Sequence, residues 1–248
     1  MLDVGQGDGL FVESPTGTHV MFDAGPPKSV LGPLAKAISP FDKNIDAFVI
    51  TNPDADHIGG LIDILKNYKV GVVLESGTLT DSKTYQSIRE EMKRQNVPDV
   101  LAKKGMRLDM GGGVIIDILF PDRNVAEWAT NDGSVVARLT YGENSIMLTG
   151  DAGAKTEKII ISENSVAELK STILKVGHHG SRTSSSVPFV KAVAPSSAFI
   201  SVGKANKYGH PHQETLDTLM QVGAKILRTD LLGTIIMKCD TMKKCTIN

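Results

Sequence analysis

A short polar segment, TNPDADHIGG (residues 51–60), interrupts the chain directly after the apolar run AFVI (residues 47–50). The apolar run predicts a buried strand, so the polar segment lies in the loop where that strand ends. Asp54, Asp56 and His57 fall within four positions there, and carboxylates beside an imidazole need partners if they are buried. Oxygen donors with one imidazole nitrogen suit a divalent cation. The alternative is a polar turn in which Asp56 caps the next helix.

The composition allows a large core and gives little guidance on partners. The chain has 248 residues, of which 41% are hydrophobic, so one α/β domain is as plausible as two small ones. A formal charge of −1 provides no overall attraction to nucleic acid, although a local basic groove is compatible with it. Cys239 and Cys245 both lie near the C-terminal end and are able to pair, but two thiols do not identify a compartment.

The N-terminal sequence, MLDVGQGDGLFVES, lacks the basic region of a signal peptide. No apolar run approaches the roughly 20 residues that cross a bilayer. We therefore expect a soluble chain and assign it no compartment. Residues 1–4 are typical of a first strand, so the protein either starts abruptly or has lost an upstream part.

Hydrophobic periodicity predicts alternating strands and helices. A hairpin is expected from residues 10–14 and 19–25, and the helix at 29–38 is expected to be regular only after Pro33. The helix at 84–96 should begin at Asp81 or Ser82 and end at Asn96. The other segments are helices at 60–68, 154–162, 187–194 and 213–222, and strands at 70–76, 107–121, 134–142, 144–151, 171–176, 197–203, 224–228 and 233–238.

This order predicts one domain, 1–248, built from two similar halves, roughly 1–110 and 111–248. Each half has strands first and strand–helix units after. Two mixed sheets stacked face to face, with helices outside, would bury both apolar sheet faces, so the fold class is α/β.

Other polar clusters also follow predicted strands, where α/β folds place their sites. They contain Asp8; Asp151; His178, His179, Ser181 and Arg182; and Asn206, Tyr208, His210 and His212. Five of the six histidines lie in these loops or in residues 51–60, which favours a metal site over scattered structural roles. We predict that His57, His178 and His210 are ligands or touch the ligands. We expect His19 and His212 to be structural.

Asp151 follows Thr149 and Gly150 at the end of a predicted strand. One interpretation is a cap for the helix that begins near Ala154. The other is a carboxylate that bridges two ions about 3.5–4 Å apart, an arrangement that activates water and stabilises both oxygens of a displacement.

Taken together, these motifs resemble the metallo-β-lactamase superfamily. TNPDADHIGG is similar to the signature H-x-[HD]-x-D-H. The pieces LDVGQGD, FDAG, NDGSVVARLTYG, LTGD, LKVGHHGS, SVGKANKYGHPH and RTDLLGT occur in the same order as in the ComEC-type hydrolase domain of DNA-uptake channels and its soluble relatives. The resemblance runs from Leu2 to about Lys238. It implies a four-layer αβ/βα sandwich with a metal site at one edge of the sheets.

The resemblance also implies a set of ligands. Asp54 would serve a first ion, Asp56 and His57 a second, and Asp151 would bridge them. His178 or His179, together with His210, would complete the shell or contact the scissile phosphate, so Asp56 and these three histidines are the predicted catalytic residues. Asn131 or Asp132 is a weaker candidate for the first ion. Zinc is usual in the superfamily, and the carboxylate-rich shell also suits manganese.

One residue departs from the signature. Asn52 stands where a histidine is usual, and an amide oxygen is a poor zinc ligand. Asn52 is therefore a weak ligand candidate, and the first ion is expected to bind weakly, only with substrate, or not at all. The cofactor is accordingly one or two divalent ions.

The function implied is a metal-dependent phosphodiesterase for single-stranded DNA, in which activated water attacks phosphorus. Ser181 and Arg182 are expected to hold a neighbouring phosphate, with Thr183 and Ser184 beside them. Lys204, Lys207 and Tyr208 would extend the substrate track. The alternatives are hydrolysis of a small ester, lactone or thioester, and a degenerate nucleic-acid-binding domain without metal. The resemblance leaves open a soluble protein or a domain excised from a membrane channel.

Overall fold

The computed structural model of the chain describes residues 1–240 and 244–248. Its first part contains β1 (Leu10–Glu13), β2 (His19–Phe22), α1 (Leu31–Ala37), β3 (Asn44–Ile50), α2 (Ala55–Ile58), α3 (Leu61–Asn67), β4 (Lys69–Glu75), α4 (Lys83–Gln95) and β5 (Asp99–Leu101). Four strands follow: β6 (Arg107–Asp109), β7 (Val114–Phe120), β8 (Val136–Tyr141) and β9 (Asn144–Leu148). The remainder contains α5 (Ala154–Glu163), α6 (Val166–Leu169), β10 (Ile173–Lys175), the 3-10 turn η1 (Gly177–Gly180), α7 (Val187–Val193), β11 (Ser197–Ile200), α8 (Gln213–Gln221), β12 (Lys225–Arg228), α9 (Thr229–Leu232), β13 (Met237–Cys239) and β14 (Cys245–Ile247).

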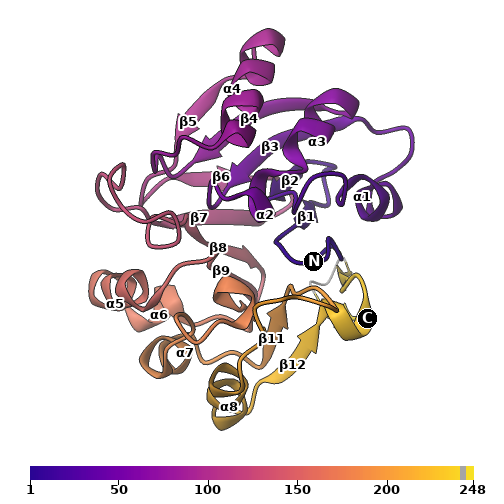
Figure 1. Cartoon of the computed structure of the whole chain (residues 1–248). Helices are drawn as coiled ribbons and strands as arrows, with labels where there is room; N and C mark the ends of the chain where they lie inside the picture. Colours follow the sequence, from indigo (N-terminus) through magenta and orange to yellow (C-terminus); the bar gives the residue numbers. More distant parts are fainter. Residues whose placement is uncertain (241–243) are drawn as a thin grey trace.

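Two mixed sheets form the centre of the molecule (Figure 1). The first has the order β1-β2-β3-β4-β5, and the second has the order β12-β11-β10-β9-β8-β7-β6. In the first sheet β2 to β5 are parallel and β1 is antiparallel to β2. In the second sheet β9 to β12 are parallel, whereas β6 to β9 form an antiparallel meander.

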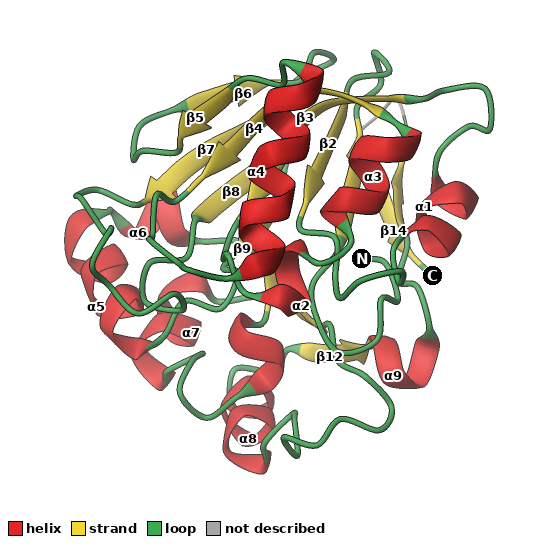
Figure 2. Ribbon diagram, turned by 45° about the horizontal axis from the view of Figure 1, so that its top comes forward, coloured by secondary structure: helices red, strands yellow, loops and turns green. Residues whose placement is uncertain are grey.

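The sheets pack face to face, with helices on both outer surfaces (Figures 1 and 2). Buried side chains between the sheets, such as Val49, Ile116 and Leu148, form one core cluster. A second cluster lies under α1, α3 and α4, and a third lies under α5 to α8. Burial on both faces of each sheet explains the nearly continuous apolar runs of the parallel strands. The predicted α/β class and four-layer αβ/βα sandwich are confirmed.

Most predicted elements are present, with several corrections. The hairpin of β1 and β2 and the turn from Tyr141 to Asn144 form as expected. Helix α4 has Ser82 at its N-cap and Asn96 in the left-handed conformation at its end. The expectation that α1 is regular only after Pro33 is wrong, because α1 begins at Leu31. Proline is tolerated there since the first N–H groups of a helix have no intrahelical partner.

Short elements account for the remaining differences. The segment predicted as one strand at 107–121 is divided into β6 and β7 by Gly111, Gly112 and Gly113, which all have positive φ. The short elements β5, α6, α9 and β14 were not predicted, and of the strand expected at 233–238 only the end belongs to β13. The exchange from one sheet to the other falls between β5 and β6, close to the predicted boundary of the halves; the single-domain assignment stays a prediction.

The C-terminal segment forms a separate two-stranded sheet, β13-β14, closed by a disulfide between Cys239 and Cys245. Both figures place this segment beside the N-terminus. No helix in residues 1–240 and 244–248 is long and apolar enough to cross a membrane.

Candidate metal centre

The loop after β3 forms the floor of the candidate site. It turns at once into the single-turn helix α2, whose N-cap is Asp54. Asp56 lies in the first turn of α2, and the helix that follows, α3, has Gly60 at its N-cap. The interpretation of Asp56 as a helix cap is therefore wrong, because α2 itself intervenes. The short helix leaves the Asp56 side chain partly exposed and buries His57 completely.

Buried hydrogen bonds fix the orientation of the His57 ring. Its Nδ1 lies 2.8 Å from Asp23 Oδ2, and Thr51 donates both its N–H and its hydroxyl to Asp23 at 2.8 and 2.5 Å. The ring N–H therefore donates to Asp23, and Nε2 points to the opposite side. There it lies 3.1 Å from Asp151 Oδ2. A histidine held by a carboxylate in this way is typical of metal ligands.

The two adjacent histidines of η1 differ in burial and in the direction of their rings. Both have positive φ, 49° for His178 and 54° for His179. The His179 ring is buried, and its Nδ1 donates to the Ser201 carbonyl at 3.0 Å. Its Nε2 consequently faces Asp56 Oδ2 at 3.4 Å and Asp151 Oδ1 at 3.8 Å. His178 is partly exposed, with Nε2 3.8 Å from Asp151 Oδ2 and Nδ1 3.2 Å from Thr183 Oγ1.

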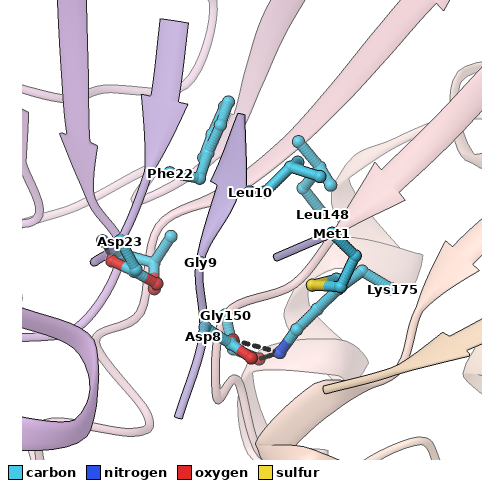
Figure 3. A pocket seen from close by; sticks show the side chains of 10 residues that line it. Met1, Asp8, Gly9, Leu10, Phe22, Asp23, Leu148, Gly150 and Lys175 are labelled. Atoms are coloured by element: carbon cyan, nitrogen blue, oxygen red, sulfur yellow. Dashed lines mark hydrogen bonds and ion pairs between the residues drawn. The ribbon is translucent and has the colours of Figure 1, made fainter. Parts of the chain in front are cut away.

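A buried acid, Asp8, and a buried lysine, Lys175, lie side by side near these histidines; Figure 3 shows the contact between Asp8 and Lys175. Lys175, at the end of β10, pairs with the Asp8 carboxylate and donates to the Gly150 carbonyl at 2.9 Å. Asp8 Oδ1 also lies 3.4 Å from His179 Nδ1. Gly7 permits this arrangement, since its φ is +144° and a Cβ there would lie 2.2 Å from the Asp56 carbonyl oxygen.

The charges of the cluster shift its pKa values strongly. Burial opposes protonation of His57, but Asp151 and Asp23 outweigh it and raise the pKa of His57 well above its usual range. Burial likewise opposes ionisation of Asp151, but His57 and His179 hold its pKa well below the usual range. Despite burial, Asp151 and Asp8 raise the pKa of His179 to about 9. Without a cation, the centre therefore retains protons that balance its carboxylates.

The same groups fit a divalent ion. Among the described residues, the buried atoms Asp8 Oδ1, His57 Nε2, Asp151 Oδ1 and His179 Nε2 have no hydrogen-bond partner. Ligand atoms of Asp56, His57 and His179 lie within 4.8 Å of one another, and so do those of Asp8, Asp151 and His179. Buried polar atoms are normally satisfied. Their convergence, with carboxylate and imidazole donors, therefore indicates a site for a cation.

The residues expected to hold a first ion are arranged differently. The Asn52 amide is fully buried, donates to Asn131 Oδ1 at 2.7 Å and accepts from the Asp54 N–H at 2.9 Å. Asp54 Oδ2 accepts from the Thr130 hydroxyl at 2.9 Å. Asp132 lies 3.7 Å from Lys155 Nζ. Each of these side chains therefore already has a protein partner, and their role as ligands stays a prediction.

The loop after β11 brings His210 to the rim of the centre. The His210 ring packs edge-on against His178 and stacks on Tyr208, with ring centroids 5.5 and 5.6 Å apart. Burial and the neighbouring histidines lower the pKa of His210 to about 4. Its Nδ1 is another buried atom without a partner among the described residues. His210 therefore presents a neutral imidazole beside the cluster.

The predicted substrate residues occupy two kinds of position. Lys204, Lys207 and Tyr208 are exposed on the loop after β11. The Arg182 side chain is also exposed and lies 3.9 Å from Glu214. Ser181 is buried and contacts Thr183 Oγ1 at 3.0 Å. The remaining neighbours are structural: the Ser184 hydroxyl donates to the Gly177 carbonyl at 2.7 Å, and His212 Nδ1 accepts from the Arg182 N–H at 3.1 Å.

Two polar alternatives from the sequence are resolved here. Asp151 is not a helix cap, because α5 has Gly153 at its N-cap and no side-chain capping bond. His19 is buried away from the centre, with Nδ1 3.0 Å from the Asn44 carbonyl oxygen. The prediction that His19 is structural agrees with this contact.

Sequence reasoning did not assign roles to Asp8, Asp23 and Lys175. Asp8 follows Gly7 in GQGD, and Asp23 lies two residues before Gly25 in FDAG; both are acids near glycine beside a predicted strand, a signal similar to the one that identified Asp151. Asp23 also has positive φ, 57°, which marks a sharp change of direction after β2. Nothing in the sequence distinguishes Lys175 from a surface lysine at the end of a strand.

Comparison with known proteins identifies the family. The profile of the metallo-β-lactamase superfamily matches residues 2–204. The chain belongs to this superfamily. Among solved structures, Igni18, a metallo hydrolase from Ignicoccus hospitalis KIN4/I, is similar in fold: it superposes with a TM-score of 0.58 at 14% identity, covering 98% of this chain and 96% of that one.

Among curated proteins, this superfamily member is similar to ComE operon protein 3 and to a competence protein. It is 33% identical to ComE operon protein 3 of Bacillus subtilis (strain 168), over 95% of this chain and 32% of the relative. It is 30% identical to competence protein ComA of Neisseria gonorrhoeae, over 94% of this chain and 31% of the relative. The chain thus spans about a third of the length of these relatives. The predicted resemblance to ComEC-type proteins is confirmed.

Proposed function

We propose that the protein is a metal-dependent phosphodiesterase that cleaves single-stranded DNA. The superfamily and the candidate metal centre support a hydrolase. The observation that carries the proposal is the convergence of buried, unpartnered ligand atoms from His57, Asp151 and His179 beside Asp56. Such a site favours binding of a cation, because each unpartnered buried atom is unfavourable.

One divalent ion fits the arrangement best. Asp56, His57, Asp151 and His179 would hold it, and Asp8 lies 3.4 Å from the other ring nitrogen of His179, Nδ1. When bound, the ion would supply a Lewis acid and activate water near neutral pH. The mixed carboxylate and imidazole donors suit manganese as well as zinc.

The residues around this centre orient the ligands and exclude water. Asp23 and Thr51 fix the His57 ring, and the Ser201 carbonyl fixes the His179 ring. Lys175 balances the negative charge of Asp8 in the buried interior. Such pre-organisation keeps the ligand atoms in place before substrate arrives.

His210 and His178 are placed to act on the substrate. His210 is neutral at neutral pH because burial and the neighbouring histidines lower its pKa to about 4. Burial also lowers the pKa of His178 despite the opposing charge of Asp151. Neutral imidazoles at the rim are suited to donate a hydrogen bond to a phosphate oxygen.

The residues around the site support an anionic polymer as the substrate. Lys204 and Lys207 are exposed on the loop that carries His210, and Arg182 follows η1. Such side chains bind phosphates without reading sequence. The similarity to proteins named for competence favours DNA within this class of substrate. Single strands fit the one exposed aromatic side chain at the rim, Tyr208.

A cleavage assay tests the proposal. The purified protein, freed of metal and resupplied with Mn²⁺ or Zn²⁺, is incubated with an end-labelled single-stranded oligonucleotide and, separately, with a panel of chromogenic esters. We expect metal-dependent cleavage of the oligonucleotide. We expect His210→Ala to reduce kcat by about 100-fold while metal content is unchanged. The exposed Lys83→Ala on α4 is the control and should match the wild type.

The other outcomes discriminate between the alternatives. Cleavage of esters alone would replace the phosphodiesterase by a small-ester hydrolase on the same fold. Binding of the oligonucleotide without metal or cleavage would identify a degenerate binding domain.

A further inference from the structure

The loop after β11, residues 203–210, is exposed along most of its length, yet one of its polar side chains turns inward. Lys204, Lys207 and Tyr208 are exposed, whereas Asn206 is only partly exposed. The proposed function uses the exposed side chains of this loop and leaves Asn206 without a role. A partly buried amide needs hydrogen-bond partners, and the side-chain partners of Asn206 lie within the same loop.

The Asn206 side chain makes three hydrogen bonds that close the loop on itself. Its Nδ2 donates to the Gly203 carbonyl at 3.0 Å and to the His210 carbonyl at 2.8 Å. Its Oδ1 accepts from the His210 N–H at 2.9 Å. Only one orientation of the amide satisfies all three contacts, because a carbonyl needs a donor and an N–H needs an acceptor. Asn206 thus holds both backbone groups of His210 at once.

Both ends of the loop are fixed independently of Asn206. At its start, the Gly203 N–H donates to Gln6 Oε1 at 3.2 Å. Just beyond its end, the His212 N–H donates to the Gly180 carbonyl of η1 at 2.9 Å. Asn206 therefore braces a span whose two ends are already anchored on other parts of the molecule.

The His210 ring depends on this brace more than the other histidines of the centre depend on their loops. The Nδ1 atoms of His57 and His179 make hydrogen bonds that orient their rings. In contrast, Nδ1 of His210 has no partner among the described residues. The His210 ring is therefore oriented by its backbone and by ring packing, such as the edge-on contact with His178 at 5.5 Å between centroids.

We propose that Asn206 is a positioning residue for His210. By holding the His210 backbone, Asn206 fixes the imidazole at the rim of the metal centre before substrate binds, so the ring does not have to be ordered during the reaction. Asn206 itself does not touch the scissile phosphate. This role in catalysis rests on the proposed function, whereas the bracing of the loop does not depend on the substrate.

Hydrogen exchange tests the brace without any substrate. In Asn206→Ala the His210 amide loses its acceptor, and we expect it to exchange at least about tenfold faster than in the wild type. The His212 amide, which donates to Gly180, is the internal reference and should exchange at the wild-type rate. Unchanged exchange at His210, or equal acceleration at His212, would overturn the proposal.

Steady-state kinetics on the single-stranded oligonucleotide tests the catalytic role. We expect Asn206→Ala to lower kcat by about tenfold, because the imidazole is displaced. KM and metal content should stay within about twofold, since the exposed lysines and the ligands are unchanged. Asn164→Ala is the matched control, because Asn164 donates to the Ile160 carbonyl at the end of α5, and it should equal the wild type. A raised KM with unchanged kcat would contradict a positioning role and place Asn206 among the groups that bind substrate.

A double-mutant cycle separates positioning of His210 from general damage to the fold. If Asn206 acts through His210, adding Asn206→Ala to His210→Ala should change kcat by less than about twofold, because the ring is already absent. Two losses that multiply would count against the proposal. If the wild type cleaves no oligonucleotide, the proposed function fails, and exchange at the His210 amide still decides whether Asn206 holds the loop.

Discussion

The two halves of the signature loop contrast sharply in how their polar atoms are satisfied. In the half formed by Asn52 and Asp54, the side chains bond to Asn131 and Thr130 and to the loop backbone. In the half formed by Asp56 and His57, His57 Nε2 faces Asp151 and the His179 ring without a hydrogen bond. The same short motif therefore contains one self-sufficient polar network and one group of buried atoms that lack partners.

The difference teaches that buried ligand sites are better recognised by missing partners than by residue type. Both halves contain an acid, and Asn52 is even more deeply buried than Asp56. The second half is the less favourable to bury without a cation, because His57 Nε2, and Asp151 Oδ1 and His179 Nε2 beside it, make no hydrogen bond. The first half is stable as a hydrogen-bonded network.

The largest difference in metal affinity is expected when one acid is removed from the metal cluster of the second half and, in a separate variant, from the first half. Asp151→Asn removes a buried carboxylate that lies beside both His57 and His179. We expect metal affinity to fall by more than about 100-fold, beyond the range for loss of an outer hydrogen-bonding partner. Asp54→Asn should change the affinity by less than about threefold. Titration calorimetry with Mn²⁺ and Zn²⁺ measures both.

Circular dichroism and Tm would show that both of these variants are folded. A loss of affinity for Asp54→Asn as large as that for Asp151→Asn would contradict the comparison. In that case the first half would be a genuine ligand set despite its hydrogen bonds.

The fold was largely predictable because it depends on hydrophobic periodicity. The apolar runs at β3, β9 and β11 and the amphipathic helix α4 lie where the sequence predicted them. The short elements α6, α9 and β5 were missed, because three or four residues carry too little periodic signal. Their positions depend on packing between segments that are distant in the sequence.

The site was predictable in composition and less so in arrangement. Asp56, His57 and Asp151 were proposed as ligands, and the resemblance offered His179 only as an alternative to His178; the structure brings Asp56, His57, Asp151 and His179 together. The choice between His178 and His179 depends on the left-handed backbone at η1, which places His179 inward. That conformation is not encoded in the motif itself.

The residues that contact the ligands from behind, Asp23 and Lys175, were also not predicted, because their roles depend on contacts between distant parts of the chain. The roles of Asp23 and Lys175 arise from contacts that span 34 residues to His57 and more than 150 residues to Asp8. A single sequence contains no pairing information at such separations.

A smaller effect on metal affinity is expected when the second half keeps its ligands but loses a hydrogen bond that orients one of them. Asp23→Asn would leave His57 in place and weaken the bond that fixes the orientation of its ring. Loss of such a partner typically costs about 10- to 100-fold in metal affinity. Asp46→Asn is a matched control, since Asp46 accepts from the His19 N–H at 2.7 Å outside the metal centre. Unchanged affinity in Asp23→Asn, measured by the same calorimetry, would show that the ring is held by packing alone.

The smallest effect is expected in the first half of the loop. The experiment tests whether Asn52 alone prevents that half from binding a metal ion. Asn52→His restores the usual residue of the signature and breaks the bond to Asn131, at a cost of roughly 1 kcal/mol. The new imidazole would lie beside Asp54, so we expect a second, weaker equivalent of bound Mn²⁺ or Zn²⁺ and a few-fold gain in activity. Asn52→Ala removes the same hydrogen bonds without adding a ligand and should bind no second ion. Equal amounts of bound metal in the two variants would mean that the residue at position 52 does not limit metal binding by the first half. In that case Asn131 and Thr130, which keep its polar groups satisfied, limit the binding.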